Sequence, residues 1–381
     1  MRKHAGKLIV LAAILAVTAV LEMKFDLFPV TAESNGSHST SLKQLENAMA
    51  GQFQERNERF TLYYSGNKED LNGSLQGTIR SSLAQDDYTA YILDSYLYTV
   101  RSHGDNSVVK MEARYRETPE QTAEVDRLIT EALGQLITPG MNDHQKVKVI
   151  HDWIVDRLEY DQTLSHYTAY EALATGYAVC QGYSLLGYKM LKQSGINVRI
   201  AEGTVKTGDH AWNMVELDGK WYHLDLTWDD PIAADNAKTS GKEKRSYRYY
   251  LKTDDELRAD HQWVKVYPPA QTSYADELTL LAESGEADSS HYAELKKQLG
   301  LHWLEDKHTV RDGEKLFRLL RTELSKQTPE LQFRYLKGEK LADDLQKAVE
   351  KTGIPAGYSA SYEPYASDGS VLVTLKLKYV P

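Results

Sequence analysis

Residues 177–183 read Tyr-Ala-Val-Cys-Gln-Gly-Tyr and hold the single cysteine of the 381-residue chain, Cys180. Apolar residues follow at helical spacing as far as Gly195, so we predict a helix whose first turn contains Cys180. Backbone N–H groups in a first turn have no partner within the helix, and the helix dipole favours negative charge. A thiolate would be stabilised there, and the thiolate is the nucleophilic form of cysteine. The same N–H groups could receive the oxyanion of a tetrahedral intermediate.

A lone cysteine limits the chemistry of the chain. It excludes an internal disulfide framework and a metal site made of several thiolates. An isolated cysteine is most often a small buried side chain. The sequence around Cys180 favours a nucleophile instead, because it also supplies a candidate base and a candidate acid companion for that base.

Two helices are predicted before the cysteine. Asn142 and Gln145 have the spacing of a capping box, and apolar residues recur behind them at helical spacing. A shorter helix over about residues 167–174 would end at Gly176, because glycine suits a left-handed helix terminus. His151 lies in the first of these helices, and we expect it to be packed or solvated rather than catalytic or metal-binding.

A β-hairpin is predicted after the cysteine helix, because Asp218-Gly219 is a two-residue turn signal between alternating segments. If the two residues that flank this turn pair with each other, His210 and Asp225 lie on one face as diagonal neighbours. Diagonal positions are about 7 to 8 Å apart at the backbone, which an imidazole and a carboxylate can span. The opposite face is mostly apolar. We expect the hairpin to bury that apolar face and to turn its His210 face toward the helix of Cys180.

The chemistry follows from these three residue types. His210 would take the proton of Cys180, and Asp225 would fix the imidazole tautomer and support its positive charge. The thiolate would then attack an acyl carbon and form a thioester, which an amine or water would resolve. His223 lies on the same predicted face as His210 and is an alternative base.

Separated blocks of sequence share a recognisable pattern. They read Tyr170-Glu171-Ala172-Leu173, Val179-Cys180-Gln181-Gly182-Tyr183, His210-Ala211-Trp212-Asn213, Gly219-Lys220-Trp221-Tyr222-His223-Leu224-Asp225 and Trp228-Asp229-Asp230-Pro231, with a later run from Tyr249-Tyr250-Leu251 to His261-Gln262-Trp263. Together these blocks, over about residues 143–263, resemble the transglutaminase-like superfamily and its bacterial transglutaminase-like domain proteins. The resemblance implies a papain-like core in which Cys180 is the nucleophile, His210 the base and Asp225 its partner. The chain departs from the pattern at Leu226, where proline is expected.

The resemblance and the sequence also bear on ligands. The sequence has no EF-hand-type loop, so the calcium dependence of some animal members is not expected, and we expect no cofactor and no metal site. Asp229 and Asp230 precede a proline, which favours a turn over a cation site. We expect Gln181 to help orient the oxyanion, and Trp212 and Tyr170 to contact substrate, although large aromatics such as Trp212 are as often packed core.

The whole chain is expected to be an α+β protein. A papain-like, transglutaminase-like catalytic core over residues 119–267 is flanked by small α+β modules over 41–118 and 309–381, with a linker at 268–308 that holds a short helix. Each module is predicted to contain a helix, a strand, a second helix and a hairpin. This shared order suggests that the two modules are copies of one unit.

The N-terminus and the overall charge indicate where the protein acts. Basic residues are followed by an apolar run over residues 8–21, which is typical of a secretory signal and shorter than the roughly 20 residues of a spanning helix. Residues 1–32 are therefore expected to be a signal peptide or a single N-terminal membrane anchor, and the protein to be extracellular or in the cell envelope. The net charge of -10 argues against a nucleic-acid partner. The oligomeric state stays open.

These features predict an exported thiol enzyme. Cys180 would form a thioester with a protein or peptide amide, such as a glutamine side chain, and the acyl group would pass to an amine or to water. A cysteine peptidase or amidase on the same triad is an alternative. An alternative of another class is a non-catalytic envelope binding or scaffold protein that kept the fold.

Overall fold

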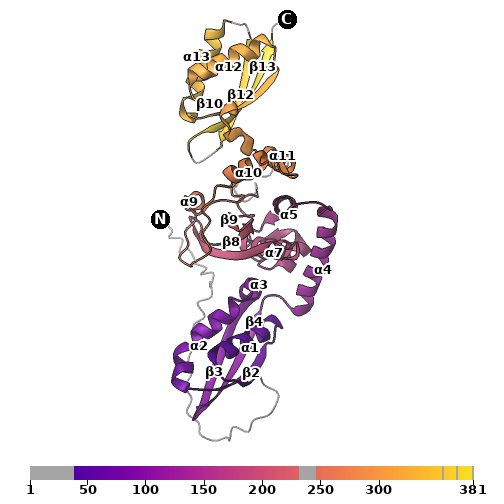
Figure 1. Cartoon of the computed structure of the whole chain (residues 1–381), viewed down its shortest axis with the longest axis vertical. Coiled ribbons are helices and arrows are strands. Elements are labelled where there is room, and N and C mark those ends of the chain that lie inside the picture. The colour runs from indigo at the N-terminus through magenta and orange to yellow at the C-terminus, as the bar shows by residue number, and fades with distance from the viewer. Residues whose placement is uncertain (1–37, 231–245, 354–355, 366–367, 380–381) are drawn as a thin grey trace, which may run out of the picture. The chain divides into compact units, whose positions relative to one another are not determined.

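The computed structural model describes residues 38–230, 246–353, 356–365 and 368–379 (Figure 1). The predicted signal or anchor at residues 1–32 lies outside these ranges. Within them, no helix has both the length and the apolar character needed to cross a membrane. The fold is α+β, as predicted, with four small sheets among the helices. Contacts divide the chain into two compact units, the first ending at Thr272 and the second beginning at Ser273.

The N-terminal module, residues 38–118, is a four-stranded sheet with helices packed on it. Its elements are β1 (His38–Ser39), α1 (Leu42–Gln54), β2 (Arg59–Ser65), α2 (Lys68–Leu83), α3 (Asp87–Ile92), β3 (Leu93–His103) and β4 (Asn106–Tyr115). The strand order is β1-β2-β4-β3, in which only the β1–β2 pair is parallel. Val109, Met111 and Ala113 of β4 are buried in the core of this module and alternate with exposed residues, so one face of the strand is covered.

The C-terminal module, residues 309–379, has the same plan. Its elements are β10 (Thr309–Val310), α12 (Gly313–Ser325), β11 (Glu330–Tyr335), α13 (Leu341–Thr352), β12 (Ala356–Pro364) and β13 (Val371–Tyr379). The strand order β10-β11-β13-β12 matches that of the N-terminal module position by position, including the single parallel pair. The helix α3 has no counterpart here, because α13 leads within a few residues into β12. A common origin of the two modules remains a prediction.

The central region joins a set of helices to a three-stranded antiparallel sheet, β7-β8-β9. Its elements are α4 (Pro119–Leu136), α5 (Asp143–Arg157), β5 (Glu159–Tyr160), α6 (Ala169–Thr175), β6 (Tyr177–Ala178), α7 (Cys180–Gln193), β7 (Asn197–Val205), β8 (Gly208–Leu217), β9 (Lys220–Leu224) and α9 (Asp254–Leu257). The capping box of α5 is present in both directions, Asn142 to Gln145 and back. Gly176 ends α6 with φ of 79°, so both of these helix predictions are confirmed.

The segment predicted as a linker is more structured than expected. It holds two α-helices that pack on each other, α10 (Tyr274–Glu283) and α11 (Ser289–Gln298), and two short 3-10 helices, η1 (Leu301–Leu304) and η2 (Asp306–His308), where one short helix was predicted. The helix α10 begins at Ser273, whose side chain accepts a hydrogen bond from the backbone N–H of Asp276. Leu278 and Leu295 are buried, so the burial of apolar side chains stabilises this helix pair.

The prediction of which hairpin face meets the cysteine helix is wrong. Asn213, on the face predicted to be mainly apolar, donates from its amide to the carbonyl of Ser184 in α7 (3.0 Å). A Cβ at Gly187 of α7 would lie 2.5 Å from Asn213 Oδ1, so the helix approaches this face too closely for any side chain there. The His210 face is covered instead by apolar residues of the segment after β9, including Leu257. Both faces of the hairpin are therefore buried. The alternation of residue types in the sequence could not show which of them meets the cysteine helix.

Candidate active site

Cys180 is the first residue of α7 and is buried. Two backbone hydrogen bonds fix the chain just before it: Val179 N–H donates to His166 O (2.9 Å), and Asp161 N–H donates to Ala178 O (2.9 Å). No side chain caps this helix, so its first N–H groups are left for another acceptor near the thiol. The helix start predicted from the sequence is confirmed.

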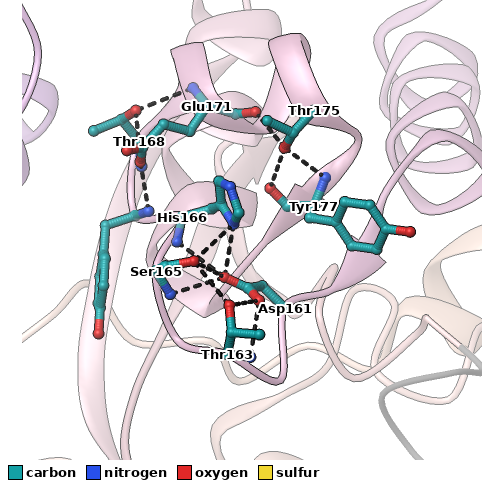
Figure 2. Close-up of polar contacts among 9 residues, drawn as sticks. Asp161, Thr163, Ser165, His166, Thr168, Glu171, Thr175 and Tyr177 are labelled. Carbon is teal, nitrogen blue, oxygen red and sulfur yellow. Dashed lines mark hydrogen bonds and ion pairs between the residues drawn. The ribbon is translucent and has the colours of Figure 1, made fainter.

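The loop before the cysteine helix is organised by one carboxylate, Asp161 (Figure 2). Its Oδ1 accepts from the backbone N–H of Thr163 (2.9 Å), and its Oδ2 accepts from the backbone N–H of Ser165 (2.8 Å) and lies 2.7 Å from Nδ1 of His166. Burial alone would raise the pKa of Asp161, but these hydrogen bonds hold it well below its usual range. The carboxylate therefore fixes the loop whose carbonyl group accepts from Val179.

Gly182 allows α7 to lie against this loop. A Cβ at this position would be 2.8 Å from Ala178 Cβ and 3.3 Å from Thr168 O. Those atoms belong to the backbone and to a short, rigid side chain, so they cannot move away without cost. Gly182, two residues after Cys180, is therefore required for the packing of the site.

His210 and Asp225 are in direct contact. The hairpin pairs Leu217 with Lys220 and Asn213 with Leu224, so the predicted register is confirmed. His210 Nε2 lies 2.7 Å from Asp225 Oδ2, and both side chains are buried. The diagonal arrangement predicted from the turn therefore brings the two residues together.

The protonation of this pair is set by burial and by charge. Burial would lower the pKa of His210, but the charge and hydrogen bond of Asp225, followed by a hydrogen bond with Cys180, raise it to about 10. Burial would raise the pKa of Asp225, yet the charge of His210 and the imidazole hydrogen bonds keep it below its usual range. Because Nε2 of His210 faces Asp225, Nδ1 is the nitrogen left for the thiol. Cys180, His210 and Asp225 thus form one connected set.

The alternative base, His223, is placed elsewhere. Its Nδ1 accepts from the indole N–H of Trp212 (2.9 Å), and its Nε2 lies 2.8 Å from Asp254 Oδ1. Burial lowers the pKa of His223. Both ring nitrogens of His223 therefore contact structural partners rather than Cys180.

The other predicted site residues lie in different surroundings. Gln181 donates from its side-chain amide to the backbone carbonyl of Tyr91 in α3 (2.6 Å), so it links α7 to the N-terminal module. Trp212 is only 1 % exposed and stacks on His210 with ring centroids 6.0 Å apart, which places it behind the imidazole. Tyr170 lies in α6, where its backbone N–H donates to Glu117 (3.3 Å). Their roles toward a substrate stay predictions.

Two neighbours of the site were not identified from the sequence. His261 Nε2 lies 3.0 Å from Asp225 Oδ2, although 36 positions separate these residues along the chain. Tyr160 lies near the thiol: burial, and then the charge of Cys180, raise its pKa to about 12. The run His261-Gln262-Trp263 was the sequence signal for His261, but only the fold shows which carboxylate His261 contacts.

His210, Asp225 and His261 also meet the distance requirement for metal ligands, since one ligand atom from each lies within 4.8 Å of the others. Both imidazole nitrogens, however, are at hydrogen-bonding distance from the same Asp225 oxygen, 2.7 and 3.0 Å. That is the geometry of two donors to one carboxylate. A metal bound to all three would have to break both hydrogen bonds.

A second buried group of polar residues lies beside the site and supports it. His151 Nε2 is 3.2 Å from Asp229 Oδ2, and Asp230 accepts from the hydroxyl of Tyr183 (2.6 Å). Backbone hydrogen bonds from Asp229 to Asp225 O and from Asp230 to Thr227 O form the predicted turn. Both carboxylates thus have protein partners, and His151 is packed, as expected.

Comparisons with known proteins identify this region. Residues 131–226 match the model of the transglutaminase-like superfamily. The chain is 29% identical over 118 residues to the kyphoscoliosis peptidases of mouse (Mus musculus) and human (Homo sapiens). That match covers 26% of this chain and only 18% of each relative's length.

Solved structures give weaker likenesses. A putative cysteine protease from Cytophaga hutchinsonii is 14% identical, with 35% of this chain and 65% of that chain covered and a TM-score of 0.25. A TGase structure is 12% identical, with 69% of this chain and 76% of that chain covered and a TM-score of 0.28. The match of residues 131–226 to the family model and the likeness to the kyphoscoliosis peptidases are therefore the stronger evidence, and both indicate similarity to transglutaminase-like domains.

Proposed function

We propose that this chain is a thiol enzyme that forms a thioester between Cys180 and the acyl group of a protein or peptide amide, and then passes that group to an amine or to water. The observation that carries the proposal is the position of His210: its Nε2 lies 2.7 Å from Asp225 Oδ2, and interaction with Cys180 contributes to its raised pKa. A base between a thiol and a buried carboxylate is the arrangement that activates a cysteine nucleophile.

The first half of the reaction uses these groups in order. Cys180 starts as a thiolate whose proton is held on Nδ1 of His210, and the sulfur forms a bond to the amide carbon. The carbonyl oxygen becomes an oxyanion, which the N–H groups of the first turn of α7 would receive. When the C–N bond breaks, His210 returns its proton to the leaving nitrogen, which departs as ammonia if the substrate is a glutamine side chain.

The second half restores the thiol. An amine or a water molecule attacks the thioester carbon while His210 takes the proton of the incoming group. The C–S bond then breaks, and the proton returns to the sulfur of Cys180. Asp225 accepts from Nε2 of His210 throughout, so it keeps the ring in one orientation and stabilises the imidazolium in both halves.

The acceptor decides between two enzyme classes. The mouse and human relatives are named kyphoscoliosis peptidases, which supports hydrolysis as the second candidate function. A glutamine-containing peptide incubated with a fluorescent amine distinguishes them. Incorporation of the amine supports transfer, whereas cleaved peptide or released ammonia without incorporation supports a peptidase or amidase.

Alkylation of the thiol tests the proposal before any substrate is known. We expect iodoacetamide to modify Cys180 at pH 6 at least tenfold faster than it modifies free cysteine, because a partner histidine stabilises the thiolate. His210→Ala should remove this advantage. A rate equal to that of free cysteine in the folded wild-type protein would favour the non-catalytic scaffold.

We also propose that the enzyme acts outside the cytoplasm. The support is the basic N-terminus followed by the apolar run at residues 8–21. Expression of the full chain with fractionation of the cells tests this. Mature protein that begins after Ala32 indicates secretion, uncleaved protein in the membrane fraction indicates an anchor, and uncleaved protein in the cytosol contradicts the proposal.

A further inference from the structure

Asp225 has a second imidazole partner. Its Oδ2 lies 2.7 Å from Nε2 of His210 and 3.0 Å from Nε2 of His261. Its Oδ1 accepts from the backbone N–H groups of Thr227 (3.0 Å) and Trp228 (3.2 Å). Four donors therefore hold this carboxylate, and one of them comes from a segment that contributes nothing else to the set of Cys180, His210 and Asp225.

Backbone hydrogen bonds hold the segment of His261 against the sheet. The next residue, Gln262, exchanges two backbone hydrogen bonds with Thr204 of β7 (2.7 and 2.8 Å). A Cβ at Gly203 would lie 2.1 Å from the carbonyl oxygen of Gln262, so the close approach requires glycine there. Gly203 is in turn the strand partner of His210. The same short stretch of β7 thus positions both histidines.

The ring of His261 is enclosed by aromatic side chains. Its centroid lies 4.6 Å from that of Trp228 and 5.2 Å from that of Trp212, and the residue is fully buried. The ring therefore has little freedom to turn. It can neither reach solvent nor exchange its hydrogen-bond partners without the loss of this packing.

Both nitrogens of His261 face carboxylates. Nδ1 lies 2.7 Å from Oδ1 of Asp260, whose other oxygen, Oδ2, accepts from the hydroxyl of Tyr249 (2.6 Å). Asp260 therefore holds the ring of His261 at its second nitrogen. Among the described residues, the charged and titratable groups around this ring are Asp225, Asp260, His210, Tyr249 and His223.

We propose that His261 is a positioning residue of the Cys180 site: it is a second donor to the Asp225 oxygen that faces His210, and it holds that oxygen in place for the imidazole. This inference rests on the proposed function. Loss of His261 would leave one lone pair of the buried Asp225 without a donor and would let the carboxylate move away from His210. Asp225 would then support the imidazolium of His210 less well, so the thiolate would be harder to form.

The rate of Cys180 alkylation measured as a function of pH tests the proposal in the full-length protein. For His261→Ala we expect the pH of half-maximal reactivity to rise by about one unit. His261→Gln keeps an amide donor within reach of Asp225 and should shift it by less. Asp260→Asn, which changes a partly exposed carboxylate, should shift the pH of half-maximal reactivity in the same direction. This variant replaces the histidine variants as the test if they do not fold.

His144→Ala is the matched control. This histidine is also buried, and its Nε2 lies 2.9 Å from Asp218 at the tip of the hairpin, away from Asp225. We expect it to lose thermal stability without moving the pH of half-maximal reactivity. Folded His261→Ala and Asp260→Asn proteins with the wild-type pH profile would overturn the inference, while a wild-type thiol that reacts like free cysteine at every pH would overturn the proposed function itself.

Discussion

The two end modules share one fold but differ in one helix. Both have a four-stranded sheet of the same order, β1-β2-β4-β3 and β10-β11-β13-β12. Among the described residues, the additional helix α3 (Asp87–Ile92) occurs in the N-terminal module alone, and it contacts α7 and β7 of the central region. Asp87 binds Arg199 of β7 through two hydrogen bonds (2.7 and 3.0 Å), and the carbonyl of Tyr91 accepts from Gln181, the residue after the cysteine.

The difference shows how one short helix supplies contacts that link an α+β module to β7 and α7 of the central region. The rest of the N-terminal module has its own core and its own sheet, as the C-terminal module does. The C-terminal module belongs to the second compact unit. We therefore expect changes in α3 and its partners to affect the thiol, and equivalent changes in the C-terminal module to affect only that module.

The largest expected effect is that of Asp87→Ala. This carboxylate is buried and also accepts from the backbone N–H of Ile200 (2.9 Å), so its removal leaves donors of β7 unpaired. We expect a loss of about 3 kcal/mol, at the low end for a broken buried pair because Arg199 is partly exposed. Urea unfolding followed by tryptophan fluorescence measures it, and the alkylation rate of Cys180 should fall as well.

The matched change in the C-terminal module is Asp368→Ala. Asp368 pairs with Arg334 but is itself 47% exposed. We expect a loss below about 1 kcal/mol and an unchanged alkylation rate, since exposed ion pairs contribute little. Equal losses in the two variants, or a slower thiol in Asp368→Ala, would contradict the distinction between the modules.

The second expected effect concerns the pH dependence of stability. The pKa of His210 is raised from an ordinary value of 6.5 to about 10, so the stabilisation by its charged contacts is fully present below pH 6.5 and is lost as the pH rises through 10. The stability advantage of wild type over His210→Gln should therefore shrink between these values. Denaturant unfolding at a series of pH values checks this. An advantage that grows with pH would show that His210 is neutral in the folded protein.

A smaller effect is expected for Gln181→Ala. The variant loses one hydrogen bond to Tyr91 O and leaves that carbonyl without this donor, at a cost of about 1 kcal/mol. Thermal unfolding of the first compact unit measures the cost. If Gln181→Ala instead abolishes substrate turnover without a change in stability, the side chain acts on the oxyanion, as the sequence first suggested.

The smallest effect is expected when the second unit is removed. Cys180, His210, Asp225 and His261 all belong to the unit that ends at Thr272. A chain that stops at this residue should keep the wild-type alkylation rate within about twofold, because no residue of the site is lost. A much slower thiol in a folded protein would show that the second unit contributes to the site.

The sequence predicted the local features of the site well. The capping box at Asn142, the turn at Asp218-Gly219 and the position of Cys180 at a helix start each depend on residues a few positions apart. A hairpin register also follows from its turn, so the contact between His210 and Asp225 could be predicted.

Features that depend on distant parts of the chain could not be predicted. The place of His261 depends on Gln262 and Gly203, which meet only in the folded protein. The covering of both hairpin faces needs α7 on one side and residues near Leu257 on the other. The helices α4 and α10 were missed for a different reason: their capping residues, Thr118 and Ser273, lie next to segments interpreted as the end of a module and as a linker.

The most direct test of the account is the pH profile of Cys180 alkylation in wild type compared with Asp225→Asn. The central claim is that a buried carboxylate, an imidazole and a thiol act as one unit. We predict a wild-type thiol that stays reactive well below pH 8.5, the usual pKa of a free cysteine, and a variant whose reactivity falls at least tenfold at pH 6. Identical profiles for two folded proteins, both following free cysteine, would contradict the claim.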